Sequence, residues 1–392
     1  MSILSDYWLI CVLAAIAASL FAFSRFSELA GYILHRYLMS LVSLFLVSVL
    51  VFFLMEILPG DCATRIMAYK NTQGTTITQA DIDAERRLRG LDEPVTVRWA
   101  TWVTNLTLRG DLGFSCARRQ PVELALGNRF WVSLLFCLVG LLLAYGIAVP
   151  LGIFSAYLLK ESASRGRVGA AFAARFRTGA VRVLGQTLDW LLRLISYLGL
   201  ALPNFLLALF IILLYVFAGE PTPTGLFSNE WRDVPWFADG RFQTGKLWDF
   251  LGHIWLPIFV IGWAATALQL QTVRALVIDE ASKLYVDAAR ARGLSGTTLW
   301  ARYPVRHSIA PLFNSIGFDF TRIFNDLPIV AVVLALTDAA ALLIEALAYT
   351  NDQELAAAIL FLVALVVVLF NFITDVVLAI VDPRVRRSVL GQ

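Results

Sequence analysis

Three charged side chains lie one helical turn apart in an otherwise apolar stretch of the sequence. The segment FDFTRIFND, residues 318–326, contains Asp319, Arg322 and Asp326. On a helix, Arg322 could pair with both carboxylates, which would make the cluster a self-neutralised structural feature. Charges inside a membrane-spanning helix also commonly face a bundle interior or a wet cavity, so the cluster could instead line a pathway and meet the charged ends of a solute. The residues alone leave both interpretations open.

No motif for catalysis or metal binding accompanies these charges. The sequence lacks the glycine-rich loops that hold phosphates, the H-E-x-x-H pair that holds zinc, and any Cys/His spacing suited to zinc; His35, His253 and His307 are scattered over different regions. We therefore expect no catalytic site, no metal and no cofactor on this chain, and we expect that it is not an enzyme. Energy for transport would come from a partner or from an ion gradient.

The composition indicates which elements must position the cluster. Of 392 residues, 59% are hydrophobic and 16% are charged, and the mean hydropathy is +0.72. A soluble domain would not tolerate this composition, whereas helices satisfy their own backbone inside lipid. We predict an all-α integral membrane protein. The apolar runs bracket the roughly 20 residues that a bilayer requires, and the expected spans are 8–23, 37–58, 130–159, 188–218, 254–274, 307–336 and 355–381.

Charges in the short loops predict the orientation. Basic residues dominate 160–186 and 274–306, so these loops are expected in the cytoplasm, whereas 337–354 contains acids and no Lys or Arg and is expected outside. Seven spans, with the N-terminus extracytoplasmic and the C-terminus cytoplasmic, place every short loop on the side that its charges predict. The net charge of +3 is explained by this topology, so we expect membrane lipid and no nucleic acid as a partner.

The long extracytoplasmic segment is predicted to be a small folded cap. Its stretch EPVTVRWATWVTNL has the apolar spacing of an interfacial helix. Cys62 and Cys116 both fall in this cap, where a disulfide would close it if the compartment is oxidising. Two unpaired small residues are the alternative, because a single sequence proves no geometry.

A polar stretch, DEASKLYVDAARARGLSGTTLW at 279–300, interrupts two very apolar regions. Acids near its start and arginines near its end complement a helix dipole, and Gly293 is suited to the left-handed residue that ends a helix. A second short helix is expected to follow. Its small alanines would let another surface approach, and the expected apolar anchors for that surface are Leu284, Tyr285, Leu294 and Trp300. A solvated linker helix is the alternative.

The segment DAARARG at 287–293 resembles the Asp/Glu-Ala-Ala-x-x-x-Gly loop of permease subunits of bacterial ABC importers. More narrowly, the chain resembles the B-type permease subunit of dipeptide, oligopeptide and nickel importers. The matching segments occur in order along the chain: YILHRYL, LPGD, GLDEPV, RGDLGFS, VPLGIFSAY, LGLALPNF, HIWLP, YVDAARARGLS and DPRVR. Each segment is weak evidence by itself, but their order and their predicted side of the membrane agree with the family.

This resemblance implies a type I ABC importer permease fold with six core helices in the bacterial inner membrane, to which residues 8–23 add one N-terminal helix. It implies a second homologous permease, two ATPase subunits or domains that bind ATP and Mg, and a periplasmic or lipid-anchored substrate-binding protein. In such a system, 279–300 is the coupling helix that docks on the ATPase. Its lever would comprise Asp287, Ala288, Ala289 and Gly293, and its docking residues would be Asp279, Tyr285 and Arg290.

The expected organisation follows from these assignments. An extra helix and linker (1–30) precede the first core helix (31–60) and the cap (61–128), and the permease core (129–387) precedes a cytoplasmic tail (388–392). The chain departs from the family where AVVLALTDAAALLIEAL replaces the usual Pro-Gly-Leu-Gly run. A self-sufficient secondary transporter or channel that uses the charged cluster is the alternative function. Peptides are the leading substrate class, before nickel complexes, opines and sugars.

Overall fold

The computed structural model describes residue 19 and residues 28–57, 61–72, 78–163, 179–238 and 241–381, and nearly all of its secondary structure is helical. The chain forms two compact units. Unit 1 combines Met1–Val132 with Thr337–Gln392, and unit 2 comprises Ser133–Leu336. Apart from residue 19, the expected span at 8–23 lies outside the described residues, as does the tail at 388–392.

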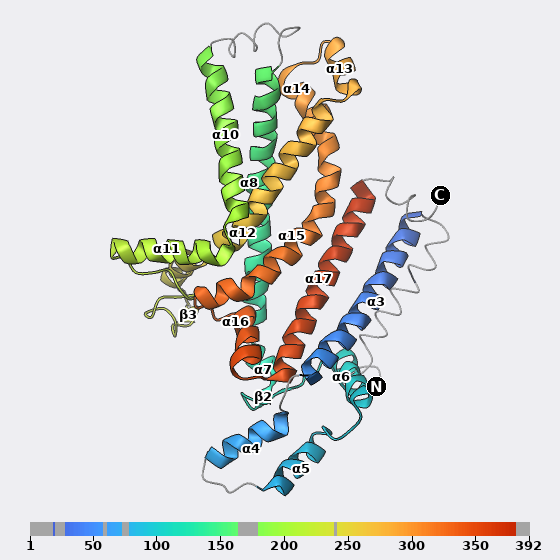
Figure 1. Cartoon of the computed structure of the whole chain (residues 1–392), viewed down its shortest axis with the longest axis vertical. Helices are drawn as coiled ribbons and strands as arrows, with labels where there is room; N and C mark the ends of the chain where they lie inside the picture. Colours follow the sequence, from blue (N-terminus) through green and yellow to red (C-terminus); the bar gives the residue numbers. More distant parts are fainter. Residues whose placement is uncertain are drawn as a thin grey trace. The chain divides into compact units, whose positions relative to one another are not determined.

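Two long helices from opposite ends of the sequence form the framework of unit 1. Helix α3 (Glu28–Ile57) packs along α17 (Gln353–Val381), as Figure 1 shows in blue and red. Near one end of the pair, Arg36 forms an ion pair of 3.3 Å with Asp375. At the other end, Val51 and Met55 join a core that includes Leu355 and Ile359. Both helices are long and apolar enough to cross a membrane.

The predicted cap is built from short elements of unit 1. It contains α4 (Cys62–Thr72), α5 (Gln79–Leu88), α6 (Val95–Thr104), the π-helical segment η1 (Asn105–Arg109) and α7 (Val122–Leu126). Strand β1 (Phe114–Ser115) pairs antiparallel with β2 (Gln120–Pro121). Pro94 precedes α6, and Gly110 ends η1 with a φ of 66°, a conformation that glycine adopts without steric cost. Helix α16 (Ala339–Ile344) and segment η3 (Glu345–Tyr349) complete the unit.

Long helices also dominate unit 2. These are α8 (Arg129–Ala163), α10 (Gly179–Ala201), α11 (Asn204–Ala218), α12 (Thr244–Ala281) and α15 (Arg306–Val333), with a small hairpin of β3 (Phe237–Ala238) and β4 (Arg241–Phe242). Helix α12 packs against α10 and α15. The contact with α10 requires Gly199, because a Cβ there would lie 2.7 Å from the Cβ of Ala267. Helices α13 (Leu284–Ala291) and α14 (Gly296–Trp300) and segment η2 (Ala301–Val305) connect α12 to α15.

The membrane spans agree with the sequence in four places and differ in two. Among the described residues, four helices, α3, α8, α12 and α17, are long and apolar enough to cross a membrane, and the bent pair α10–α11 raises the number to five if it counts as one span. The span predicted over 188–218 is not one continuous helix, because the chain bends by 104° between α10 and α11, where Pro203 has no N–H to continue the helix. Within the span predicted over 307–336, α15 (Arg306–Val333) is helical but is not one of those apolar spans.

Candidate functional site

The polar stretch forms a compact two-helix element at one end of unit 2. Helix α13 ends before Gly293, whose φ of +89° provides the expected left-handed turn, and α14 follows (Figure 1). One side of α13 packs inward, where Val286 and Ala289 contact Leu299 of α14. The other side is exposed at positions with helical spacing, namely Leu284, Asp287, Ala288 and Ala291. This exposed side is called the α13 face below.

The start of the coupling segment differs from the prediction. Asp279 and Glu280 belong to the last turn of α12, which continues to Ala281, so they do not begin the following helix and do not complement its dipole. Helix α13 starts only after Lys283, an N-cap residue with extended backbone. Lys283 forms ion pairs with Glu280 and, at 3.7 Å, with Asp279. The hydrogen bond to Glu280 raises the pKa of Lys283, so the lysine stays charged and joins the two helices.

Two expected docking or anchor residues face inward instead. The Tyr285 hydroxyl donates a 2.6 Å hydrogen bond to Glu280, and its ring contacts Tyr303 and His307. Burial, followed by that hydrogen bond, raises the pKa of Tyr285. Trp300 is buried against Tyr157 of α8. These aromatic rings stabilise the element because they pack on its inner side. Leu284, which is 86% exposed, is the large apolar residue that remains on the α13 face.

The lever residues named from the family motif are divided between the two sides of α13. Ala289 is fully buried, whereas Ala288 and Asp287 are exposed, and Arg290 is half-buried and forms an ion pair of 3.3 Å with Asp287. A further cluster ties the element to three long helices. Trp300 packs with Ala156 of α8, Val277 of α12 and Leu312 of α15. A displacement of α13–α14 would therefore be passed directly to these helices.

A buried polar network that the sequence analysis missed links α8, α10 and α12. Asp189 is 2% exposed and accepts hydrogen bonds from Ser155 and, at 3.0 Å, from Arg274 Nε. Arg193 also pairs with Asp189, at 3.2 Å. Arg274, the first residue of the basic stretch 274–306, served above only to predict the orientation of that loop. The available signal was Asp189 itself, because an acid within a predicted membrane span is expensive without a partner.

In the charged cluster of α15, both acids make hydrogen bonds to other helices, and the charge of Arg322 acts on them from beyond ion-pair distance. Asp319 accepts hydrogen bonds from Tyr145 (2.6 Å) and Gln269 (2.5 Å), and Asp326 accepts one from Asn204 (2.8 Å). Within the described parts of the chain, none of the ion pairs involves Arg322. The pairing of Arg322 with both acids that the spacing allowed is therefore not formed. The acids instead bind neutral side chains of neighbouring helices.

In unit 1, the acids of 337–354 attach the β1–β2 hairpin to the start of α17. Asp352 accepts hydrogen bonds from Ser115 Oγ (2.6 Å) and the Ala117 amide (3.0 Å), and Glu354 accepts one from the Phe114 amide (2.9 Å). Glu345 forms an ion pair of 2.9 Å with Arg118 of the hairpin. The sequence analysis used these acids only to orient the loop. Their packing role could not be found from local sequence, because their partners lie more than 200 residues earlier.

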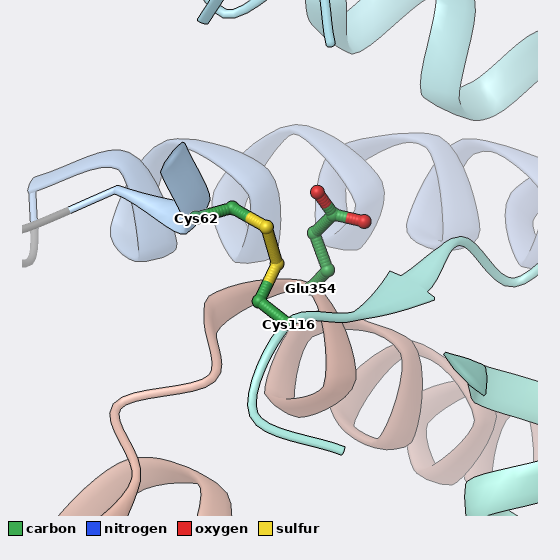
Figure 2. A group of neighbouring side chains, drawn as sticks. All are labelled: Cys62, Cys116 and Glu354. Carbon is green, nitrogen blue, oxygen red and sulfur yellow. A yellow bond between two sulfur atoms is a disulfide. The ribbon is translucent and has the colours of Figure 1, made fainter. Parts of the chain in front are cut away.

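The two cysteines of the cap form a disulfide with a Cα–Cα distance of 5.5 Å, and Figure 2 shows Glu354 beside it. The two sulfur atoms and a carboxylate oxygen of Glu354 lie within 4.8 Å of one another. A metal ion binds thiolate, and the sulfurs of a disulfide carry no such charge. We therefore assign no metal to this group in its oxidised form.

Comparison with known proteins places the chain in a family. Residues 166–387 match the family described as "Binding-protein-dependent transport system inner membrane component", and residues 29–130 match its N-terminal counterpart. The chain belongs to this family. It is a multi-pass protein of the inner membrane and a permease component of an ABC importer, whose function requires an ATPase and a substrate-binding protein as partners. The alternative of a self-sufficient secondary transporter is therefore not adopted.

Several curated relatives cover nearly the whole chain. The oligopeptide transport system permease protein AppB of Bacillus subtilis (strain 168) is 28% identical, and the alignment covers 91% of this chain and all of AppB. The glutathione transport system permease protein GsiC of Shigella flexneri serotype 5b (strain 8401) is 26% identical, with coverage of 91% and 99%. The probable D,D-dipeptide transport system permease protein DdpB of Escherichia coli (strain K12) is 26% identical, with coverage of 87% and 93%.

Proposed function

We propose that this chain forms half of the translocation pathway of an ATP-driven importer of peptides or similar small solutes. A second homologous permease forms the other half, and two ATPase subunits or domains bind ATP and Mg, so this chain itself catalyses nothing. A periplasmic or lipid-anchored binding protein delivers the solute. The peptide assignment is supported by the names of the relatives, which transport oligopeptides, glutathione and D,D-dipeptides.

This proposal is supported chiefly by the exposure of the α13 face. Leu284, Ala288 and Ala291 are exposed, while the opposite side of the helix is packed against α14. Exposed small residues allow a partner's backbone to approach, and an exposed leucine contributes apolar area on binding. We infer that the ATPase docks on this face. The proposed orientation, with the N-terminus extracytoplasmic and the C-terminus cytoplasmic, places α13 on the cytoplasmic side, as the loop charges favour.

Coupling also requires that the docked helix move its neighbours. The packing of Trp300 against α8, α12 and α15 supports a rigid connection, and the Lys283–Glu280 ion pair limits bending between α12 and α13. Closure of the ATPases would therefore shift α13, and the long helices would follow as a unit. The α15 cluster is proposed to line the pathway, where the guanidinium of Arg322 can meet a carboxylate of the solute.

The test is a reconstituted complex assayed for solute-stimulated, vanadate-sensitive ATP hydrolysis and for uptake. Ala288→Asp and Leu284→Asp place a charge on the α13 face without disturbing its packed side. We expect both variants to lose uptake and to lose the ATPase from the purified complex. Ala100→Asp, at an exposed alanine of the cap, is the matched control and should retain both activities. ATPase retention and normal uptake in the α13 variants would refute the docking assignment.

A further inference from the structure

Unit 1 contains a pocket that the importer function does not explain. It has a volume of about 130 Å³ and lies where α3, α6, the beginning of α4 and the beginning of α17 meet. One wall is apolar and aromatic, with Phe52 and Met55 from α3 and Trp102 from α6. The lining also includes Glu354 and the disulfide, which Figure 2 shows next to each other. The pocket is therefore lined both by aromatic rings and by a carboxylate.

Most of the charges around the pocket are already paired. Glu56 forms an ion pair of 2.6 Å with Arg98, and Asp61 forms one of 2.6 Å with Arg86. Glu354 differs, because within the described part of the chain its Oε2 accepts only the Phe114 amide and no cation lies within ion-pair distance. Arg89 and Arg98 act on it from farther away, but each is paired with another acid.

The close fit around Glu354 fixes the direction of its carboxylate. A Cβ at Gly113 would lie 3.2 Å from Oε2, and Gly113 itself has a φ of +98°, so only glycine fits this position without strain. Oε2 is therefore held against the backbone of the hairpin. Glu354 lines the pocket, and among the described residues no hydrogen bond goes to its Oε1, so this oxygen is available to a bound group. Nearby Asp352 adds a second negative charge, which makes the site more attractive to a cation.

We propose that this pocket binds a primary ammonium group carried on a short alkyl chain. The ammonium would donate a hydrogen bond to Glu354 Oε1, and the methylene groups would lie against Phe52, Met55 and Trp102. Aromatic faces attract cations, so the apolar wall favours the charged amine as well as its alkyl stem. A cavity of about 150 Å³ holds a benzene molecule, so this slightly smaller volume suits an amine of about four carbons. A free amine, the amino terminus of a peptide and a lysine side chain all carry this group.

The test is titration calorimetry on the purified full chain in lipid nanodiscs, with n-butylamine, n-butanol and butyrate as probes of equal length and different charge. We expect n-butylamine to bind and the other two to bind at least tenfold more weakly. Glu354→Gln retains an acceptor for the Phe114 amide but removes the charge. It should weaken n-butylamine binding by about tenfold or more, the loss expected for a charged hydrogen bond.

The matched control is Glu123→Gln. Glu123 also accepts a hydrogen bond from the cap backbone, at the Leu112 amide, but it does not line the pocket. This variant should bind n-butylamine within twofold of the native chain. Thermal melting and the presence of the disulfide report whether each variant is folded. If Glu354→Gln does not fold, Phe52→Leu replaces it, because it keeps an apolar side chain while removing an aromatic face. It should weaken amine binding more than n-butanol binding.

Two further binding experiments distinguish a peptide amino terminus from an aminoalkyl chain as the group that the pocket binds. Glycylglycine competes with n-butylamine if the pocket accepts a peptide amino terminus, and its N-acetylated form then does not. If only n-butylamine and the lysine side chain of N-acetyl-lysine amide bind, the pocket takes aminoalkyl chains. Both outcomes support an ammonium site. Equal binding of n-butylamine and n-butanol, or undiminished binding by the folded Glu354→Gln chain, would overturn the proposal.

Discussion

Ser115 and Asp352 are joined by a buried hydrogen bond of 2.6 Å, although 237 residues separate them in the sequence. Asp352 also accepts the Ala117 amide and so holds the β1–β2 hairpin on the start of α17. Replacing Asp352 by Ala would leave the buried Ser115 hydroxyl without its acceptor and would remove the acceptor of the Ala117 amide. We expect a loss of about 2–4 kcal/mol in the free energy of unfolding of the cap. Limited proteolysis should then cleave the hairpin region faster, while Asp92→Ala, at an exposed acid, should not change the rate.

The disulfide should contribute strongly to cap stability. It links cysteines separated by 54 residues, and the chain-entropy relation for a loop of this length gives about 4 kcal/mol. We expect the Cys62→Ser/Cys116→Ser double variant to unfold its cap at a markedly lower denaturant concentration. A dithiol reductant should lower the midpoint of the native chain toward the same value. If reductant destabilises the double variant equally, the effect does not come from this disulfide.

Arg274 should be important to the packing of α8, α10 and α12. Its guanidinium is within 3.0 Å of Asp189, which is almost fully buried, so removing it leaves a buried carboxylate with only Arg193 as a cation. We expect Arg274→Met to cost about 3 kcal/mol. The combination with Asp189→Asn should cost less than the sum of the single variants, which a double-mutant cycle from thermal melting in detergent would measure. Strict additivity would show that the two side chains do not interact.

Asp61 should make cap stability dependent on pH. Burial raises its pKa, but hydrogen bonds from Thr64 and Arg86, with the charge of Arg86, outweigh burial, so the pKa lies below the ordinary value of 3.8. A lowered folded-state pKa contributes stability that is present above 3.8 and is lost as the pH falls through the lower value. Denaturant midpoints from about pH 5 downward should therefore fall less steeply in Asp61→Asn. Asp92→Asn, at an exposed acid, should retain the native slope.

Arg322 is expected to affect transport more than stability. Arg322 forms no ion pair within the described part of the chain and acts on Asp319 and Asp326 only from a longer distance, while both acids keep their hydrogen bonds in Arg322→Gln. We expect uptake of a dipeptide to fall at least tenfold with little change in melting temperature. Asn325→Gln, at an exposed position on the same helix, should transport normally. A large loss of stability without a specific loss of uptake would assign Arg322 to packing instead.

Local sequence predicted the long elements well because each depends on its own composition. Apolar runs were sufficient to locate α3, α8, α12 and α17, and Gly293 correctly indicated the end of α13. Helix α10–α11 shows the limit of this approach. The apolar run passes through Pro203 unchanged, and composition alone does not show whether a proline bends a span or only kinks it.

The polar contacts were less predictable because they depend on tertiary partners. Asp319 and Arg322 have ideal helical spacing for pairing, yet Tyr145 and Gln269 from other helices bind Asp319 instead. Asp279 and Glu280 were placed at the start of the wrong helix, because nothing local marks the break at Ser282 as clearly as a glycine or proline would. Tyr285 is an aromatic residue of the kind that often anchors a docking partner, but its hydrogen bond to Glu280 holds the side chain inward.

Unit 1 combines two segments that lie far apart in the sequence, so its parts are synthesised at different times. Both cysteines of the cap leave the ribosome early, so the disulfide can close as soon as the nascent cap reaches an oxidising compartment. The acids that attach the hairpin, and the helix that packs against α3, are translated more than 200 residues later. The cap is thus cross-linked before it is anchored. Ribosomes that stop before α17 would release a chain in which α3 and the cap lack their packing partner and expose apolar surface.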